Sequence, residues 1–248
     1  MGWLKEKYTK QYFLQRDDEG RKLPYGVFGV EYWERGELYP EARMLLDTLD
    51  LANADVLDIG IGRGDSMRYC LQHGVKYITG IDFAEASIEI ARSTLAGLMK
   101  KNYQLVCDDA LAFLENQPKI PRFTHVFLLD VIEHIPRYEV EQLLPQIFER
   151  LVPGGVLVIH TPFFIEDDDI IVSGGKEICK DSSDKFEATA GMHVNRYSAE
   201  GLGIQLQNFG FARWSPHMFF RPIGAIPVWH YHGLGRAKLA KLFGYYVR

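Results

Sequence analysis

Short apolar runs recur along the middle of this chain, and amphipathic stretches separate them. The runs cover residues 55–59, 76–82, 103–107, 123–129 and 155–161. Apolar runs of this length between polar turns are typical of buried strands, and helical periodicity between them indicates crossover helices. The alternation predicts an α/β fold in which helices cover both faces of a doubly wound, mostly parallel sheet.

The flanking segments extend this pattern. We predict a helix at 41–51, a turn at Pro153-Gly154-Gly155, a helix at 197–209, a strand at 211–220 and a short basic amphipathic helix at 235–248. We divide the chain into an aromatic N-terminal lead-in or cap (1–40), a catalytic domain (41–220) and a C-terminal extension (221–248). The long acidic stretch 163–193 is either a functional loop or lid, or a solvated insert.

A glycine-rich turn follows the first predicted strand. The run that ends in Asp58 is followed by Gly60, Gly62 and Gly64, and a predicted helix then begins at Ser66. Glycines at such a turn allow the backbone to approach a flat ligand closely, since there is no side chain and positive φ is permitted. The segment therefore predicts a site for a nucleotide-like cofactor.

The spacing of the glycines separates the candidate cofactors. A dinucleotide fingerprint reads G-x-G-x-x-G and places a pyrophosphate at the helix N-terminus. Here Asp65 stands where the last glycine of that fingerprint would be. A carboxylate at this position would repel a pyrophosphate, whereas it suits a ligand that carries an ammonium and a sulfonium.

Each of the first four predicted strands leads into an acidic residue. These residues are Asp58, Asp82, Asp109 (with Asp108 as the alternative) and Asp130. Aspartate after a single strand is ordinary turn chemistry. Four in succession favour a ligand site at the carboxyl edge of a parallel sheet, which is where open α/β sheets bind ligands.

The loop resembles motif I of the class I S-adenosylmethionine-dependent methyltransferases, and Leu151-Val152-Pro153-Gly154-Gly155 is similar to the L-x-P-G-G signature of that family. The resemblance covers roughly residues 40–220. It implies a seven-stranded sheet with an antiparallel C-terminal edge, and S-adenosylmethionine as cofactor. It also implies that Asp82 binds the ribose hydroxyls, Phe83 lies against adenine and Asp109 accepts from the adenine amino group. The full implied cofactor set is Asp58, Gly60, Gly62, Gly64, Asp82, Phe83, Asp109, Ala110 and Leu129.

Candidate catalytic residues follow the fourth strand, in Asp130-Val131-Ile132-Glu133-His134. If this turn is helical, the spacing places Asp130, Glu133 and His134 on one face. His193 follows the long acidic stretch. His134 and His193 are the candidate general bases, because imidazole titrates near neutral pH.

The same run is similar to that of two metal-using branches, the ubiquinone-biosynthesis O-methyltransferases and the small-RNA terminal 2′-O-methyltransferases. That resemblance implies a divalent metal held by Asp130, Glu133, His134 and His193, with Asp130 in place of a glutamate. In the alternative interpretation, Glu133 is a structural hydrogen-bond acceptor and His134 lines the acceptor pocket. Tyr8, Tyr12 and Tyr25 either cap the site or pack a terminal helix.

Composition narrows the possible functions. The formal net charge is −5, which argues against a nucleic-acid-binding surface over the whole chain. No stretch is apolar enough to span a membrane, and the three widely separated cysteines fit a cytoplasmic protein. The expected partner is a small-molecule or glycan acceptor, with oxygen favoured over nitrogen.

Two other functions stay open. One is methylation of RNA or another nucleic acid. The other is a nicotinamide-dependent reductase, or a non-catalytic partner with the same fold. Oligomeric state is also open, because the apolar stretch 223–228 fits either a homodimer interface or a core.

Overall fold

The computed structural model describes residues 6–16, 19–21, 29–99, 102–163, 195, 197, 199–211, 213–219 and 240–247. The chain forms two compact units. Residues 1–118 with 122–127 make up the first unit, and residues 119–121 with 128–248 make up the second. Within the described ranges, no helix has the length and apolar character needed to cross a bilayer.

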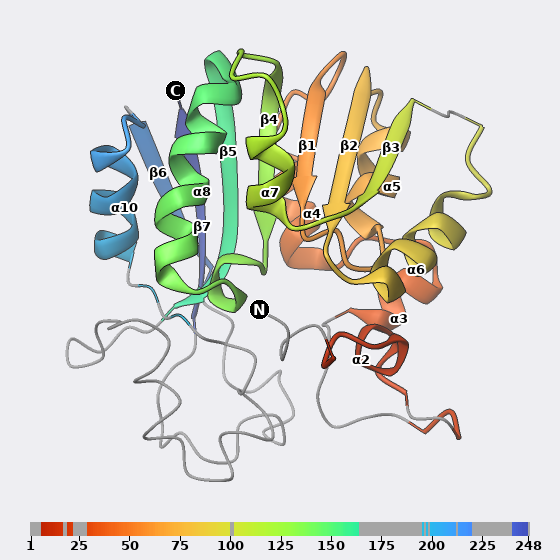
Figure 1. Cartoon of the computed structure of the whole chain (residues 1–248). Helices are drawn as coiled ribbons and strands as arrows, with labels where there is room; N and C mark the ends of the chain where they lie inside the picture. Colours follow the sequence, from red (N-terminus) through yellow and green to blue (C-terminus); the bar gives the residue numbers. More distant parts are fainter. Residues whose placement is uncertain are drawn as a thin grey trace, which may run out of the picture. The chain divides into compact units, whose positions relative to one another are not determined.

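The first unit is a parallel sheet with helices. Its strands are β1 (Asp55–Ile59), β2 (Tyr77–Asp82), β3 (Tyr103–Cys107) and most of β4 (Phe123–Leu129), in the order β3-β2-β1-β4 (Figure 1). β1 pairs in parallel with β2, and β2 with β3. Its helices are α2 (Lys10–Leu14), α3 (Val30–Glu34), α4 (Pro40–Leu46), α5 (Asp65–Gln72), α6 (Glu85–Leu95) and α7 (Ala110–Glu115).

The hydrophobic pattern explains this arrangement. β1 is buried from Val56 to Ile59, and β2 is buried from Ile78 onward. Strands that are covered on both faces read as continuous apolar runs, as these do. α5 and α6 bury one face each, with Met67 and Ala91 fully buried. The predicted α/β architecture of alternating strands and helices is confirmed here.

The second unit contains η1 (Ile132–His134), α8 (Arg137–Arg150), β5 (Leu151–Phe163), α10 (Ala199–Asn208), β6 (Arg213–Phe219) and β7 (Ala240–Val247). Its strands lie in the order β5-β7-β6, and β7 is antiparallel to both neighbours. α8 buries Leu143, Leu144 and Ile147. The predicted helix at 197–209 and strand at 211–220 correspond to α10 and β6.

Two predictions in this unit are wrong. The predicted basic helix at 235–248 contains a strand, β7, which pairs with β5 from Val156 to Phe163. A strand here satisfies the backbone of both β5 and β6, and the local charge pattern carries no sign of that pairing. The predicted turn at 153–155 lies within β5, where Gly154 takes φ +79° and the chain continues as a strand.

Candidate functional site

The glycine turn between β1 and α5 has the backbone that the sequence predicts. Gly60, Gly62 and Gly64 all have positive φ, at 74°, 52° and 78°. The Gly60 N–H donates to the Ile81 carbonyl at 2.8 Å, so the turn is bound to the end of β2. This conformation presents bare backbone at the carboxyl edge of the sheet, where a ligand can approach closely.

Asp82, the last residue of β2, fixes this turn. Its Oδ2 accepts a hydrogen bond from the Gly62 N–H at 3.0 Å, and its Oδ1 accepts one from the Ala84 N–H at 2.9 Å. Burial raises the pKa of Asp82, and these backbone donors oppose that shift. Each carboxylate oxygen has a second lone pair. The residue therefore fits the predicted contact with ribose hydroxyls.

Asp58 lies within the same unit and is almost fully buried. Its Oδ2 accepts a hydrogen bond from Ser66 Oγ at 2.5 Å. Burial raises its pKa from the ordinary value of 3.8 to about 7, and the charges of Asp82 and Asp65 add to that shift. A cation bound beside this carboxylate would favour its ionised form.

Asp65 corrects part of the sequence argument. We predicted that the Asp65 carboxylate repels a pyrophosphate and suits a cationic ligand, but Asp65 pairs with the buried Arg63, whose Nη2 lies 2.9 Å from Asp65 Oδ2. Arg68 Nη2 also lies 3.7 Å from Oδ1. The charge of Asp65 is therefore compensated within the protein. Asp58, in contrast, is hydrogen-bonded to the uncharged Ser66 hydroxyl.

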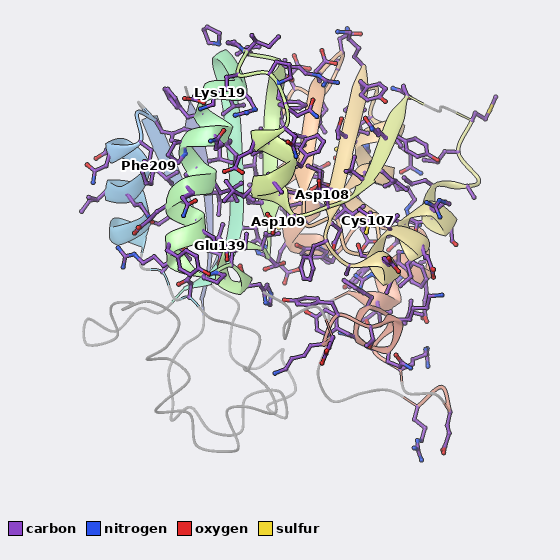
Figure 2. The ribbon with its side chains drawn as sticks, in the orientation of Figure 1. Cys107, Asp108, Asp109, Lys119, Glu139 and Phe209 are labelled. Carbon is purple, nitrogen blue, oxygen red and sulfur yellow. The ribbon has the colours of Figure 1, made fainter. Side chains whose placement is uncertain are left out.

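The ends of β2 and β3 meet beside the turn. The Asp108 N–H donates to the Asp82 carbonyl at 3.1 Å. Asp109 caps α7, since its Oδ1 accepts from the Leu111 N–H at 3.0 Å, and Ala110 begins that helix (Figure 2). Phe83 lies edge-on to Tyr8, with ring centroids 4.9 Å apart. The capping role adds to Asp109 a structural function that we did not predict.

In the second unit, Asp130 pairs with a buried histidine of β5. Asp130 Oδ2 lies 2.9 Å from His160 Nδ1, and the Asp130 N–H donates to the His160 carbonyl at 2.7 Å. Asp130 has φ +55°, a left-handed conformation that is uncommon outside glycine. Its side chain is 29% exposed, whereas that of His160 is fully buried. Two contacts with one residue hold Asp130 in this turn.

Glu133 is held separately. Thr161 Oγ1 donates to Glu133 Oε2 at 2.9 Å, and Glu133 is 2% exposed. Successive side chains of a strand point to opposite faces, so His160 and Thr161 lie on opposite faces of β5. Asp130 and Glu133 are therefore held by partners on different faces of that strand. The prediction that Asp130, Glu133 and His134 share one helical face is wrong, since η1 begins only at Ile132.

These contacts bear on the metal hypothesis. In the part of the chain that the structure describes, no group of three or more His, Cys, Asp or Glu side chains is placed to hold a metal ion. Asp130 and Glu133 already have partners on β5. The predicted ligand set includes a residue beyond the described ranges, so the shared metal stays a prediction. His193 lies outside the described residues, as do Tyr25 and 164–194.

The other predicted residues of this unit, His134 and Leu129, lie close to the end of β4. His134 ends η1, and its N–H donates to the Val131 carbonyl at 2.9 Å. Leu129 ends β4 and is half-buried. Asn195 anchors the chain to this region, because its N–H donates to the Glu133 carbonyl at 3.0 Å.

The sequence pattern alone did not single out Arg63, His160, Thr161 or Asn195 as residues of the site. A charged residue between the glycines of a tight turn was the available signal for Arg63. A polar pair inside the apolar run 155–161 was the signal for His160 and Thr161. Nothing in the sequence pattern marks Asn195.

Comparisons with known proteins identify the family of this chain. A family model described as "Methyltransferase domain" matches residues 32–215. A tRNA U34 carboxymethyltransferase of Idiomarina loihiensis is 27% identical over 201 residues, which cover 80% of this chain and 58% of that protein. A ubiquinone biosynthesis O-methyltransferase of Neisseria meningitidis is 30% identical over 129 residues, covering 48% of this chain and 52% of that protein. The chain thus spans little more than half the length of these relatives.

Solved structures show the same fold. The phosphoethanolamine N-methyltransferase 2 of Haemonchus contortus, solved in complex with S-adenosyl-L-methionine, superposes with a TM-score of 0.65 at 16% identity. The match covers 97% of this chain and 60% of that one. At this identity the likeness establishes the Rossmann-like fold alone.

Proposed function

We propose that this chain, which belongs to the methyltransferase domain family, transfers a methyl group from S-adenosylmethionine to a hydroxyl group of a small molecule or of a sugar or glycan precursor. An amine is the less favoured acceptor. The observation that carries the cofactor assignment is the glycine turn, whose backbone Asp82 fixes at the carboxyl edge of the sheet.

The residues present fit this cofactor. The cofactor, when bound, supplies an activated methyl group on a sulfonium. We assign the methionine end to the turn at Gly60, Gly62 and Gly64, with Asp58 toward its ammonium. We assign the ribose to Asp82. A cationic ligand suits this environment because burial disfavours the charge of both carboxylates in its absence.

The adenine end would contact the ends of β2 and β3. We assign the adenine face to Phe83, and its amino group to Asp109 with Ala110 beside it. Leu129 completes the set. The hydrogen bond from Asp108 to the Asp82 carbonyl supports this assignment, because it brings the two strand ends together.

Transfer to a hydroxyl requires orientation and removal of one proton. The bound cofactor would supply the methyl group to the acceptor oxygen with its sulfur as the leaving group, and the hydroxyl proton would go to a base. We assign that base to His134 or His193. Asp130, which His160 orients, would position the acceptor hydroxyl as a hydrogen-bond acceptor.

A second candidate is methylation of RNA. One relative is named for action on tRNA, although it shares only 27% identity and extends well beyond this chain. The net charge of −5 weighs against a broad phosphate-binding surface. We therefore favour the small acceptor.

The test is transfer of labelled methyl groups from S-adenosylmethionine. The acceptor panel contains phenols, sugars and nucleotide-sugars, primary amines and bulk tRNA, each with and without a chelator. We expect labelled product from a hydroxyl compound, unchanged by chelation, and none with Asp82→Ala. Product from tRNA alone, or from amines alone, would contradict the proposed acceptor.

A further inference from the structure

A short N-terminal segment, residues 8–16, packs against the glycine turn. Phe13 is 3% exposed. Its ring carbon Cε1 lies 3.8 Å from the position that a Cβ atom would take at Gly62. The Gly62 N–H is held by Asp82, and the Ser87 hydroxyl donates to the Gly62 carbonyl at 2.7 Å. Gly62 is thus fixed by two hydrogen bonds and by an aromatic ring from a distant part of the sequence.

Arg63 lies in the glycine turn, directly before α5, and its side chain connects the turn to this segment. Its Nη1 donates to the Phe13 carbonyl at 3.2 Å. Its Nε and Nη2 donate to Asp65 Oδ2 at 3.2 Å and 2.9 Å. The Arg63 side chain is only 1% exposed. Undocking of the segment would remove the Phe13 carbonyl as an acceptor for the Arg63 guanidinium. Because a buried guanidinium is costly without partners, this loss would be unfavourable.

The other end of the segment reaches the residue assigned to adenine. Tyr8 is buried and lies edge-on to Phe83 with centroids 4.9 Å apart. Tyr8 also contacts Tyr12 and Phe13, at 5.1 Å and 6.1 Å between ring centroids. The same segment therefore touches both the turn after β1 and the residue after β2. In Figure 1, α2 lies below β1 and β2.

We propose that residues 8–16 form a wall of the cofactor site and that Phe13 and Arg63 couple the docking of this segment to cofactor binding. Both are positioning residues, because they act through the backbone of Gly62 and the start of α5. This proposal rests on the cofactor assignment made above. Coupling is reciprocal: docking raises the affinity for the cofactor, and the cofactor raises the docked population by the same factor.

A simple packing role makes a different prediction. If the segment only covers apolar surface, substitutions would lower stability without changing how the ligand affects the segment. Two measurements on the full chain separate these cases. One is calorimetric affinity for S-adenosylhomocysteine. The other is the rate of tryptic cleavage at Lys10 and Arg16, with and without saturating S-adenosylhomocysteine.

The variants are Phe13→Leu, Phe13→Ala, Arg63→Lys and Arg63→Met. The matched control is Glu141→Gln, which breaks an exposed ion pair with Arg137 within α8 and leaves residues 8–16 unchanged. We expect Phe13→Ala and Arg63→Met to lose at least about tenfold in affinity, with Phe13→Leu and Arg63→Lys intermediate. Saturating ligand slows cleavage in the wild type and in Glu141→Gln, but not in Phe13→Ala or Arg63→Met.

Phe13→Leu and Arg63→Lys decide the matter if the harsher variants fail to fold. Affinities within twofold of wild type in these folded variants, with equal ligand protection, would overturn the coupling and leave the cofactor assignment standing. A wild-type protein that does not bind S-adenosylhomocysteine would overturn the cofactor assignment and the coupling with it.

Discussion

Three carboxylates with little exposure to solvent shape the chemistry of the glycine turn. Asp58, Asp65 and Asp82 all have raised pKa values, and burial is the first cause for each. Arg63 compensates Asp65, but Asp58 has a hydroxyl partner and Asp82 has backbone partners. A ligand with a positive charge would lower the free-energy cost of ionising Asp58 and Asp82. This is a physical reason for the turn to prefer a cationic cofactor over a pyrophosphate.

The pKa of Asp58 predicts how the stability of the ligand-free protein depends on pH. The pKa of Asp58 is about 7 in the folded protein against an ordinary 3.8. The contribution of protonated Asp58 to the free energy of unfolding is therefore complete below pH 3.8 and is lost as pH rises through about 7. We expect the free energy of unfolding to fall between about pH 4 and 7 and to level off above that range, by at most about 1.4 kcal/mol per pH unit from this group.

Urea denaturation at several pH values measures this trend. Asp58→Asn resembles the protonated form, so it should flatten the dependence, whereas the exposed control Glu19→Gln should not. Equal slopes for wild type and Asp58→Asn would contradict the assigned pKa. Excess S-adenosylhomocysteine should reduce the fall in the wild type, because its ammonium favours ionised Asp58.

Thr161 tests the structural role that we give to Glu133. Thr161→Val removes the hydroxyl that donates to the buried Glu133 carboxylate and keeps the shape of the side chain. Leaving that carboxylate without this donor should cost about 1–3 kcal/mol in the free energy of unfolding. Thr161→Ser retains a hydroxyl and should cost less. A loss below about 0.5 kcal/mol for Thr161→Val would show that Glu133 does not depend on this bond.

At the scale of elements, α5 and α6 approach each other closely at one glycine. Gly64 has φ +78°, and a Cβ there would lie 3.0 Å from Ala91 Cβ. Gly74, at the far end of α5, has φ +86° but open space around it. The two positions share the backbone requirement and differ in crowding.

We therefore expect Gly74→Ala to cost about 1–2 kcal/mol from left-handed strain alone. Gly64→Ala should cost more, since Ala91 must also move, and it should weaken S-adenosylhomocysteine binding. Thermal unfolding and calorimetry on both variants provide the comparison. Equal losses of stability in the two variants would mean that α5 and α6 can move apart at this contact without a free-energy cost.

Elements that a local pattern specifies were predictable. The strand–glycine–helix passage from β1 to α5 follows from an apolar run, three glycines and an amphipathic stretch, and the acids at strand ends follow from the same reading. The basic segment near the C-terminus was misread as a helix. Its strand is stabilised by pairing with β5 and β6, which are distant in sequence.

The prediction for the run after β4 was wrong for a related reason. Helical periodicity applies only where the backbone is helical, and Asp130 takes a left-handed conformation that is held by His160 on β5. A contact between residues thirty positions apart decides where that side chain points. No spacing rule within the run could have supplied it.

At the scale of the whole molecule, the family match runs from 32 to 215 and so includes parts of both compact units. The cofactor turn belongs to the first unit, and the Asp130–His160 and Glu133–Thr161 pairs belong to the second. The N-terminal segment that contacts the turn begins before the matched region. The domain boundaries at 40 and 220, and the role of 163–193 as a lid, stay predictions.

The most direct test of the central claim is calorimetric titration of the full chain with S-adenosylhomocysteine, with NADH as the comparison ligand. Wild type should bind S-adenosylhomocysteine with micromolar affinity and should not bind NADH. Asp82→Ala, checked for folding by circular dichroism and accompanied by Asp82→Asn, should lose at least about tenfold in affinity. A wild-type protein that ignores S-adenosylhomocysteine, or that binds NADH instead, would contradict the assignment of the glycine turn.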